Sequence, residues 1–227
     1  MLPLIAAVFT AATSPAPNAV EQAQALENAG DDRGALRLLT AAVVENPTWA
    51  IGRVELGRLE LKLGETDAAF AQLDIARSLA PENPRAHYLF ALAADDAGHR
   101  NESRRALEVA LALRSGYADA QQRLASVLVA EGDFAGASVA LRAYLSAHPD
   151  ANGARLQLAD ALERAGSRKE AEAELRTLIE VPALKTLAGR RLVALLEAAG
   201  RQGEAEKLRV KLDPPKRQLR DLKPSKR

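Results

Sequence analysis

Six glycines recur at a fixed spacing of 34 residues, and this spacing limits what the chain can fold into more than any other feature of its sequence. Five residues after each glycine stands a small residue. The glycines are Gly30, Gly64, Gly98, Gly132, Gly166 and Gly200, and the small residues are Ala35, Ala69, Ser103, Ala137, Ala171 and Ala205. A fixed period of this length is the signature of a repeat architecture. We therefore predict an array of units in which each unit packs against its neighbours.

Each repeat is expected to hold two amphipathic helices separated by its glycine. In the second repeat, Leu56, Leu59 and Leu63 lie three and four residues apart, as on one face of a helix. Gly64 then ends this helix, because a left-handed residue is favourable there. Pro81 ends the following helix, because proline cannot continue it. Hydrophobic residues make up 48% of the chain and aromatic residues only 4%, which favours closely packed Ala and Leu helices over a β-sandwich. We predict an all-α fold.

The pattern resembles the tetratricopeptide repeat, whose signature has a large and then a small residue at positions 7 and 8, glycine at 15 and alanine at 20. Positions 7 and 8 are here Leu56-Gly57, Phe90-Ala91, Leu124-Ala125, Leu158-Ala159 and Leu192-Val193. The resemblance implies a right-handed α-solenoid of helix-turn-helix repeats over residues 16–212. Counted from the glycines, the repeats cover residues 16–49, 50–83, 84–117, 118–151, 152–185 and 186–212.

The same resemblance implies a concave groove lined by the first helix of each repeat, with positions 5, 9 and 12 pointing into it. The partner-binding residues that it implies are Val54, Arg58, Leu61, Tyr88, Leu92, Asp95, Gln122, Ser126, Val129, Leu156 and Asp160. Tyr88 with Leu92 and Val129 is the candidate anchor pocket, because an aromatic beside aliphatic side chains is a common composition of binding hot spots.

Two further expectations concern this groove. Asp160 and Glu163 in the fifth repeat and Glu197 in the sixth make the predicted groove acidic toward its last two repeats. The apolar members have a second interpretation, because residues at helical spacing also pack between helices. In that alternative Val54, Leu61 and Leu92 support the array and contact no partner.

The chain lacks the residue patterns of an enzyme or a metal site. It has no cysteine, which excludes disulfides and thiolate zinc sites. Its three histidines, His87, His99 and His148, have no mutual spacing that suggests a metal site. Neither a phosphate-binding glycine loop nor a nucleophile motif is present. We predict no catalytic activity, no cofactor and no bound metal.

The first 15 residues differ in composition from the repeats. Leu2 to Ala12 is an uncharged run of 11 residues, shorter than the about 20 that span a bilayer but of the length of a signal-peptide core. We expect residues 1–15 to be a signal peptide and linker, which would place the protein in the periplasm or outside the cell. No Lys or Arg precedes the apolar run, and the alternative is the apolar N-terminus of a cytoplasmic protein.

Residues 213–227 form a basic C-terminal tail. Its basic side chains are Lys216, Arg217, Arg220, Lys223, Lys226 and Arg227. The formal net charge of the whole chain is only +1, so the chain as a whole has no general attraction to nucleic acid or membrane, and an electrostatic partner would meet the tail. Leu219 and Leu222 are spaced for one helical turn and could cover the end of the last repeat; the alternative is a solvated tail.

These features predict a non-catalytic scaffold that binds an extended or helical segment of another protein in its concave groove. With the expected signal peptide, the predicted role lies in bacterial envelope assembly or secretion. The alternative function makes the basic tail the active part, tethering the array to an anionic membrane or to nucleic acid.

Overall fold

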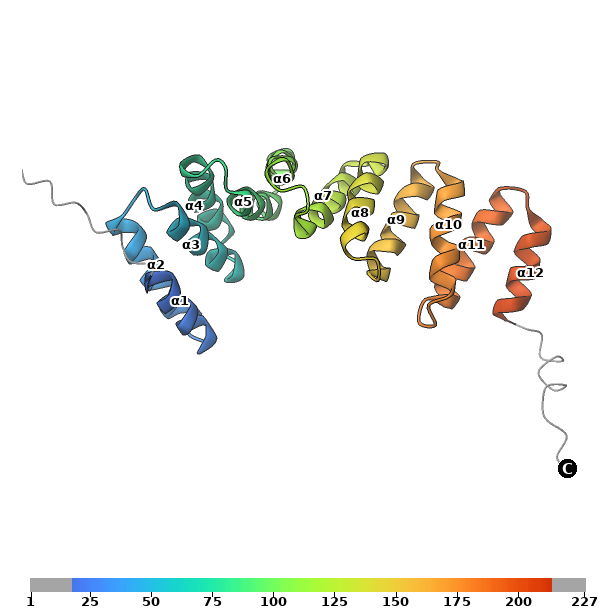
Figure 1. The fold of residues 1–227 in the computed structure, drawn as a ribbon, viewed down its shortest axis with the longest axis horizontal. Helices are drawn as coiled ribbons and strands as arrows, with labels where there is room; N and C mark the ends of the chain where they lie inside the picture. The colour runs from blue at the N-terminus through green and yellow to red at the C-terminus, as the bar shows by residue number, and fades with distance from the viewer. Residues whose placement is uncertain (1–17, 214–227) are drawn as a thin grey trace, which may run out of the picture. The chain divides into compact units, whose positions relative to one another are not determined.

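The protein is described here from a computed structural model that covers residues 18–213. The expected signal peptide and linker, and the basic side chains from Lys216 onward, lie outside the described residues. The described residues form twelve helices and no strand, so the all-α prediction is confirmed (Figure 1). The helices are α1 Asn18–Asn28, α2 Asp32–Glu45, α3 Ala50–Lys62, α4 Thr66–Leu79, α5 Pro84–Asp96, α6 Arg100–Leu113, α7 Ala118–Glu131, α8 Phe134–Ala147, α9 Asn152–Arg164, α10 Arg168–Ile179, α11 Lys185–Ala198 and α12 Gln202–Leu212.

The chain divides into two compact units, Met1–Ser115 and Gly116–Arg227. The first unit holds the hairpins α1–α2, α3–α4 and α5–α6, and the second unit holds α7–α8, α9–α10 and α11–α12. Within each unit the two helices of a hairpin pack on each other, and the second helix packs against the first helix of the next hairpin. Each unit is therefore a stack of helical hairpins in which neighbours supply the packing, as expected for repeats.

The core is built from the alanines and leucines that recur with the glycines. The small residues five positions after the glycines are at most 1% exposed. The leucines four positions further on are equally buried, with Leu73 and Leu107 at 0% and Leu141 at 1%. In the second unit, buried leucines from α8 to α11 form one continuous cluster, which includes Leu158, Leu175 and Leu192. Small side chains allow the helices to approach closely, so this aromatic-poor sequence can still fill its core.

The six repeated glycines all adopt left-handed backbone conformations, with φ between 76° and 83°. At Gly132 the amide donates to the carbonyl of Val129 at 3.1 Å, and the amide of Asp133 donates to the carbonyl of Leu128 at 2.9 Å. These bonds close the end of α7 in a Schellman-type turn. A Cβ atom added at Gly132 would meet nothing within 4 Å, so backbone conformation alone accounts for the glycine.

The turns between repeats are held by a side chain from the fourth position of the following repeat. In three repeats this side chain donates a hydrogen bond to the carbonyl oxygen of a proline six residues earlier. The pairs are Arg53 with Pro47 at 2.8 Å, His87 with Pro81 at 2.8 Å and Arg155 with Pro149 at 2.7 Å. Each bond ties the first turn of a first helix to the chain segment that leads into it. None of the helices between residues 18 and 213 is both long and apolar enough to cross a membrane.

Candidate partner-binding groove

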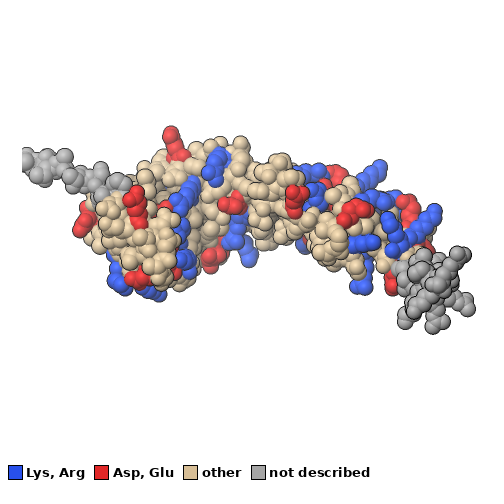
Figure 2. Space-filling model, turned by 60° about the horizontal axis from the view of Figure 1, so that its bottom comes forward, with Lys and Arg blue, Asp and Glu red and all other residues tan. Residues whose placement is uncertain are grey.

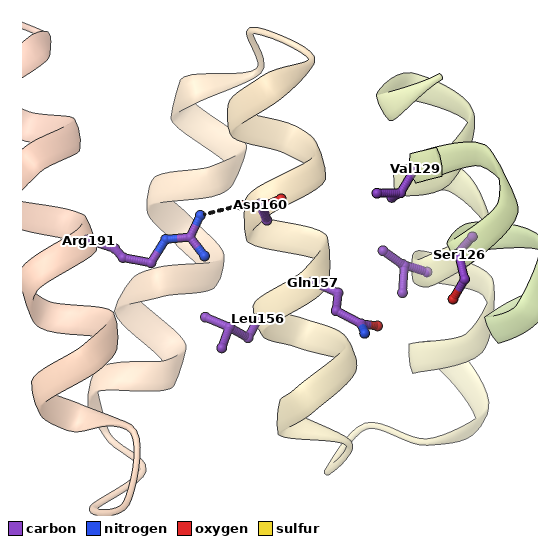
Figure 3. A pocket seen from close by; sticks show the side chains of 8 residues that line it. Ser126, Val129, Leu156, Gln157, Asp160 and Arg191 are labelled. Carbon is purple, nitrogen blue, oxygen red and sulfur yellow. Dashed lines mark hydrogen bonds and ion pairs between the residues drawn. The ribbon is translucent and has the colours of Figure 1, made fainter. Parts of the chain in front are cut away.

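A cavity of about 400 Å³ opens between three first helices of the second unit, α7, α9 and α11. Figure 3 shows Val129 of α7 pointing toward α9, and Arg191 of α11 reaching toward Asp160 of α9. The side chains that line the cavity are Ala125, Ser126, Val129, Leu141, Leu156, Gln157, Asp160 and Arg191. Four of these residues, Ser126, Val129, Leu156 and Asp160, were predicted as groove residues from their repeat positions.

The convergence of these four residues follows from helical geometry. Ser126 and Val129 are three residues apart on α7, and Leu156 and Asp160 are four residues apart on α9, so each pair lies on one face of its helix. Because α8 packs against both α7 and α9, the two first helices are held as neighbours with these faces toward the same space. Successive repeats thus place their groove positions around one cavity: positions 9 and 12 of the fourth repeat and positions 5 and 9 of the fifth.

The floor of the cavity is apolar and its rim is polar. Ala125 and Leu141 form part of the buried core, at 2% and 1% exposure, and the half-buried Val129 and Leu156 pack against that core. At the rim, the hydroxyl of Ser126 donates to the carbonyl of Gln122 at 3.2 Å, which leaves its lone pairs available as acceptors. The Gln157 side chain is exposed and offers both an amide donor and a carbonyl acceptor.

The acidic side chains of this groove are compensated by arginines. Arg191 donates from Nη2 to Oδ1 of Asp160 at 2.7 Å and lies 3.2 Å from Oε2 of Glu163. Arg164 lies 3.8 Å from the second oxygen of Asp160. On the next hairpin, Glu197 pairs with an arginine of α12 at 2.5 Å. Blue and red side chains are accordingly interspersed over the last helices in Figure 2.

This pairing corrects the expectation of an acidic groove in the last two repeats. Asp160 and Glu163 share Arg191, and Glu197 shares Arg209. The acidic residues at positions 9 and 12 of the last two repeats are thus neutralised by arginines that stand at other positions of the repeat. A partner would meet a nearly neutral rim around an apolar floor.

The predicted groove residues of the first unit have mixed environments. Val54 is 2% exposed and belongs to the core, so the packing interpretation holds for this residue. Arg58 is half-buried and bonds to Glu55 at 2.8 Å and to Glu27 of α1, which joins the first helices of two repeats. The remaining residues are half-buried and do not line the two first-unit cavities around Phe90 and around Pro81: Leu61, Tyr88, Leu92 and Asp95.

The candidate anchor of Tyr88, Leu92 and Val129 combines residues of both units. Tyr88 and Leu92 belong to the first unit, whereas Val129 lines the cavity of the second unit together with Leu156. Gln122 is exposed, and its backbone carbonyl accepts a hydrogen bond from the Ser126 hydroxyl.

Four of the eight cavity residues were not predicted for the groove: Ala125 and Leu141, which belong to the core, and the polar Gln157 and Arg191. Gln157 and Arg191 both occupy position 6 of their repeats, a column that the family pattern does not assign to the groove. A signal for Arg191 was nevertheless present, because it stands 31 residues after Asp160, and Arg58 stands at the same distance after Glu27. In both cases a basic and an acidic side chain meet across neighbouring first helices. No group of three or more His, Asp or Glu side chains that could hold a metal occurs within residues 18–213.

Comparisons with known proteins agree with this architecture. A family model described as "Tetratricopeptide repeat" matches residues 128–196, and no curated protein sequence matches the chain. The crystal structure of MamA protein is similar with a TM-score of 0.67 and 23% identity, covering 76% of this chain and 94% of that one. YrrB, described as a TPR protein with an unusual peptide-binding site, has a TM-score of 0.68 and 20% identity, covering 81% and 98%. The Naa15/Naa10 complex bound to HypK-THB contains a chain with a TM-score of 0.69 and 18% identity, of which 31% is covered.

These similarities show the fold, and the matched family model runs from the end of α7 into α11, which includes the cavity residues Val129, Leu156, Asp160 and Arg191. The left-handed glycines and the buried small residues five positions later follow the repeat signature through all six hairpins. Residues 128–196 thus match the tetratricopeptide repeat family, and the other described hairpins repeat the same glycine and small-residue signature.

Proposed function

We propose that this protein is a non-catalytic scaffold that binds an extended or helical segment of a partner protein in the groove of its second unit. Proteins of this repeat family generally mediate protein–protein interaction. The observation that carries the proposal is the cavity itself, in which the half-buried Val129 and Leu156 stand above buried core residues and beside a polar rim. Convergent polar groups around an apolar pocket are typical of binding sites.

The groove supports binding that is driven mainly by apolar contact. A cavity of about 400 Å³ accommodates an aliphatic or aromatic side chain of a bound segment. Burying one such side chain contributes about 1.5–3 kcal/mol. Because Asp160 and Arg191 neutralise each other, a charged partner gains little from the rim. Gln157 is placed to exchange hydrogen bonds with a peptide group of the segment, which would fix its direction.

The test is a selection of peptides on the full chain, followed by affinity measurements with groove variants. Leu156→Arg places a charge on the apolar floor and is expected to weaken binding of the selected peptides at least tenfold. Val139→Arg is the matched control, since Val139 is 67% exposed on the second helix α8 and lines no part of the cavity. If the two variants bind the selected peptides with equal affinity, the groove is not the binding site.

We further propose that the scaffold acts in the bacterial envelope, in assembly or secretion. This proposal is supported by the uncharged run from Leu2 to Ala12 at the start of the sequence. Cell fractionation together with mass spectrometry of the mature N-terminus tests it. An intact Met1 on a protein recovered with the cytoplasm would contradict it.

The alternative function, a tether through the basic tail, is supported by the six basic side chains after residue 215. Sedimentation with anionic liposomes at low and high salt tests it, because electrostatic attachment weakens as salt is added. Deletion of residues 216–227 should abolish the sedimentation and leave peptide binding in the groove unchanged. If the deletion does not change the sedimentation, the tail is not a tether.

A further inference from the structure

Glu60 occupies a position that other repeats fill with a buried apolar residue. Position 11 is Ala94, Leu128, Leu162 and Leu196 in the third to sixth repeats, with exposures of 0%, 4%, 2% and 1%. Glu60 is 6% exposed, so most of its side chain lies in the same buried environment as those residues. A carboxylate at such a position costs free energy, because burial removes its hydration.

The carboxyl group of Glu60 is also poorly compensated. Its Oε2 atom is buried and has no hydrogen-bond partner among the described residues. The helices that pack most closely against α3 are α2, α4 and α5, and α1 contacts α3 through Glu27, which pairs with Arg58 and Lys62. The charged or titratable groups on these four helices and on the N-cap of α4 are Glu21, Glu27, Asp32, Arg33, Arg37, Glu45, Glu65, Asp67, Asp74, Arg77, Arg85, His87, Tyr88, Asp95 and Asp96, and those on α3 itself are Arg53, Glu55, Arg58 and Lys62.

Most of these groups have partners other than Glu60. Asp32 pairs with Lys62, Arg33 with Glu65, Asp74 with Arg77, Arg85 with Glu55, and His87 with the carbonyl of Pro81. Glu65 does act on Glu60, but as a like charge. The surroundings of Glu60 therefore disfavour its ionised form and supply no cation to offset it.

Burial, with a smaller contribution from Glu65, raises the pKa of Glu60 from 4.5 to about 7. The direction of the effect on folding follows from the raised value. Below pH 4.5 the carboxyl is neutral in both the folded and the unfolded chain, and its contribution to stability is fully present. As the pH rises, the unfolded chain ionises first, and this contribution is lost by the time the pH passes about 7.

We propose that Glu60 is a proton-sensitive element of the first unit, which lets α3 pack tightly against α2 and α4 while its carboxyl is protonated and loosens that packing when the carboxyl ionises. This device is independent of the groove in the second unit, because it rests on the core of α2, α3 and α4. The packing of the second repeat would therefore become less stable as the pH rises from mildly acidic to mildly alkaline values.

The experiment compares the full chain with Glu60→Leu, which restores the residue found at Leu128, and with Glu60→Gln, which keeps the shape without the charge. Urea unfolding is measured from pH 4.5 to 8, with hydrogen exchange of peptides from α2, α3 and α4 as the local readout. The ratio of the folding constant of Glu60→Leu to that of the wild type should grow with pH by up to roughly 300-fold. The ¹³C resonance of the Glu60 carboxyl should titrate near pH 7 and be missing in Glu60→Gln.

Glu45→Gln is the matched control, because Glu45 is an exposed glutamate on α2 and its ratio to the wild type should not change with pH. A Glu60 resonance that titrates near 4.5 would overturn the proposal. A Glu60→Leu ratio that is constant over the pH range would also overturn it, whether or not Glu60→Gln folds well.

Discussion

Arg53 donates from Nε to the carbonyl oxygen of Pro47 at 2.8 Å, from a residue that is only 9% exposed. Its Nη1 also donates to Oε1 of Gln72 at 2.5 Å, so one guanidinium joins the turn between repeats, α3 and α4. Arg53→Met keeps the aliphatic contacts but leaves both acceptors without this donor. We expect it to lower the free energy of unfolding by about 1–3 kcal/mol, measured by urea unfolding.

The control for this substitution is Arg37→Met. Arg37 is exposed on α2, and the same chemical change there should alter the free energy of unfolding by less than about 0.5 kcal/mol. If the two variants lose equal stability, the bond from Arg53 to Pro47 does not hold the turn.

Gly132 and Gly153 separate the effect of backbone conformation from that of space. A Cβ atom would meet nothing within 4 Å at either residue, but only Gly132 has a positive φ, of 82°. Gly132→Ala should therefore destabilise the protein by about 1–2 kcal/mol, because the left-handed conformation disfavours a side chain. Gly153→Ala, at the second residue of α9, should be neutral or stabilise by up to about 1 kcal/mol. Thermal unfolding of both variants measures the difference, and shifts of the same sign and size would contradict it.

The fold could be predicted because each repeat contains short-range sequence signals for its own helices. Gly132 marks the end of α7, and Ala137, five residues later, marks the buried face of α8; both features recur every 34 residues. Each of these signals concerns contacts within one hairpin, so the sequence alone was enough to locate the helix ends and the buried helix faces. Ser126, Val129, Leu156 and Asp160 come from two hairpins, and their shared cavity was predictable because the family resemblance assigns their positions to the groove side of the first helices.

The charges were harder to predict because their partners come from neighbouring repeats. Asp160 indicated an acidic groove when only its own column was considered, and Arg191, in a different column, reverses that conclusion. Val54 and Val129 both stand at positions assigned to the groove, yet Val54 is in the core and Val129 lines a cavity. A repeat consensus assigns both positions to the groove and does not distinguish these two environments. The column that contains Glu60 did carry a signal, since every other repeat has an apolar residue there.

Glu172 gives the second unit a pH response opposite to that of Glu60. The guanidinium of Arg201 donates to Glu172 at 2.6 Å, and this hydrogen bond, aided by Arg176, holds the pKa of the Glu172 carboxyl below its usual value of 4.5. A lowered folded-state pKa means that the contribution to stability is present above pH 4.5 and is lost as the pH falls through the folded-state value. Hydrogen exchange of α12 should therefore accelerate in acid, relative to intrinsic rates, more in the wild type than in Glu172→Gln.

Glu180→Gln is the control for this acid response. Glu180 is exposed at the end of α10, and removing its charge should leave the acid response of α12 as in the wild type. An unchanged response in Glu172→Gln would show that the bond to Arg201 does not attach the last helix.

Arg191 sets the charge of the groove, and its removal should change which partners bind. Arg191→Ala leaves Asp160 and Glu163 without their shared cation, so the rim gains one net negative charge while Val129 and Leu156 remain. The loss of stability should be small, about 1 kcal/mol or less, because the pair is partly exposed.

Peptide selection on Arg191→Ala should enrich Lys and Arg relative to selection on the wild type, and the affinities of those peptides should fall as salt is added. Arg142→Ala is the matched control, since Arg142 forms a comparable ion pair with Glu170 on the second helices α8 and α10, away from the cavity. If both variants select the peptides that the wild type selects, the ion pair between Arg191 and Asp160 supports the stack without contributing to recognition. The two variants lose the same kind of ion pair and differ only in where the uncompensated carboxylates lie. If only Arg191→Ala changes the selection, the choice of partner therefore depends on the near-neutral charge of the groove rim.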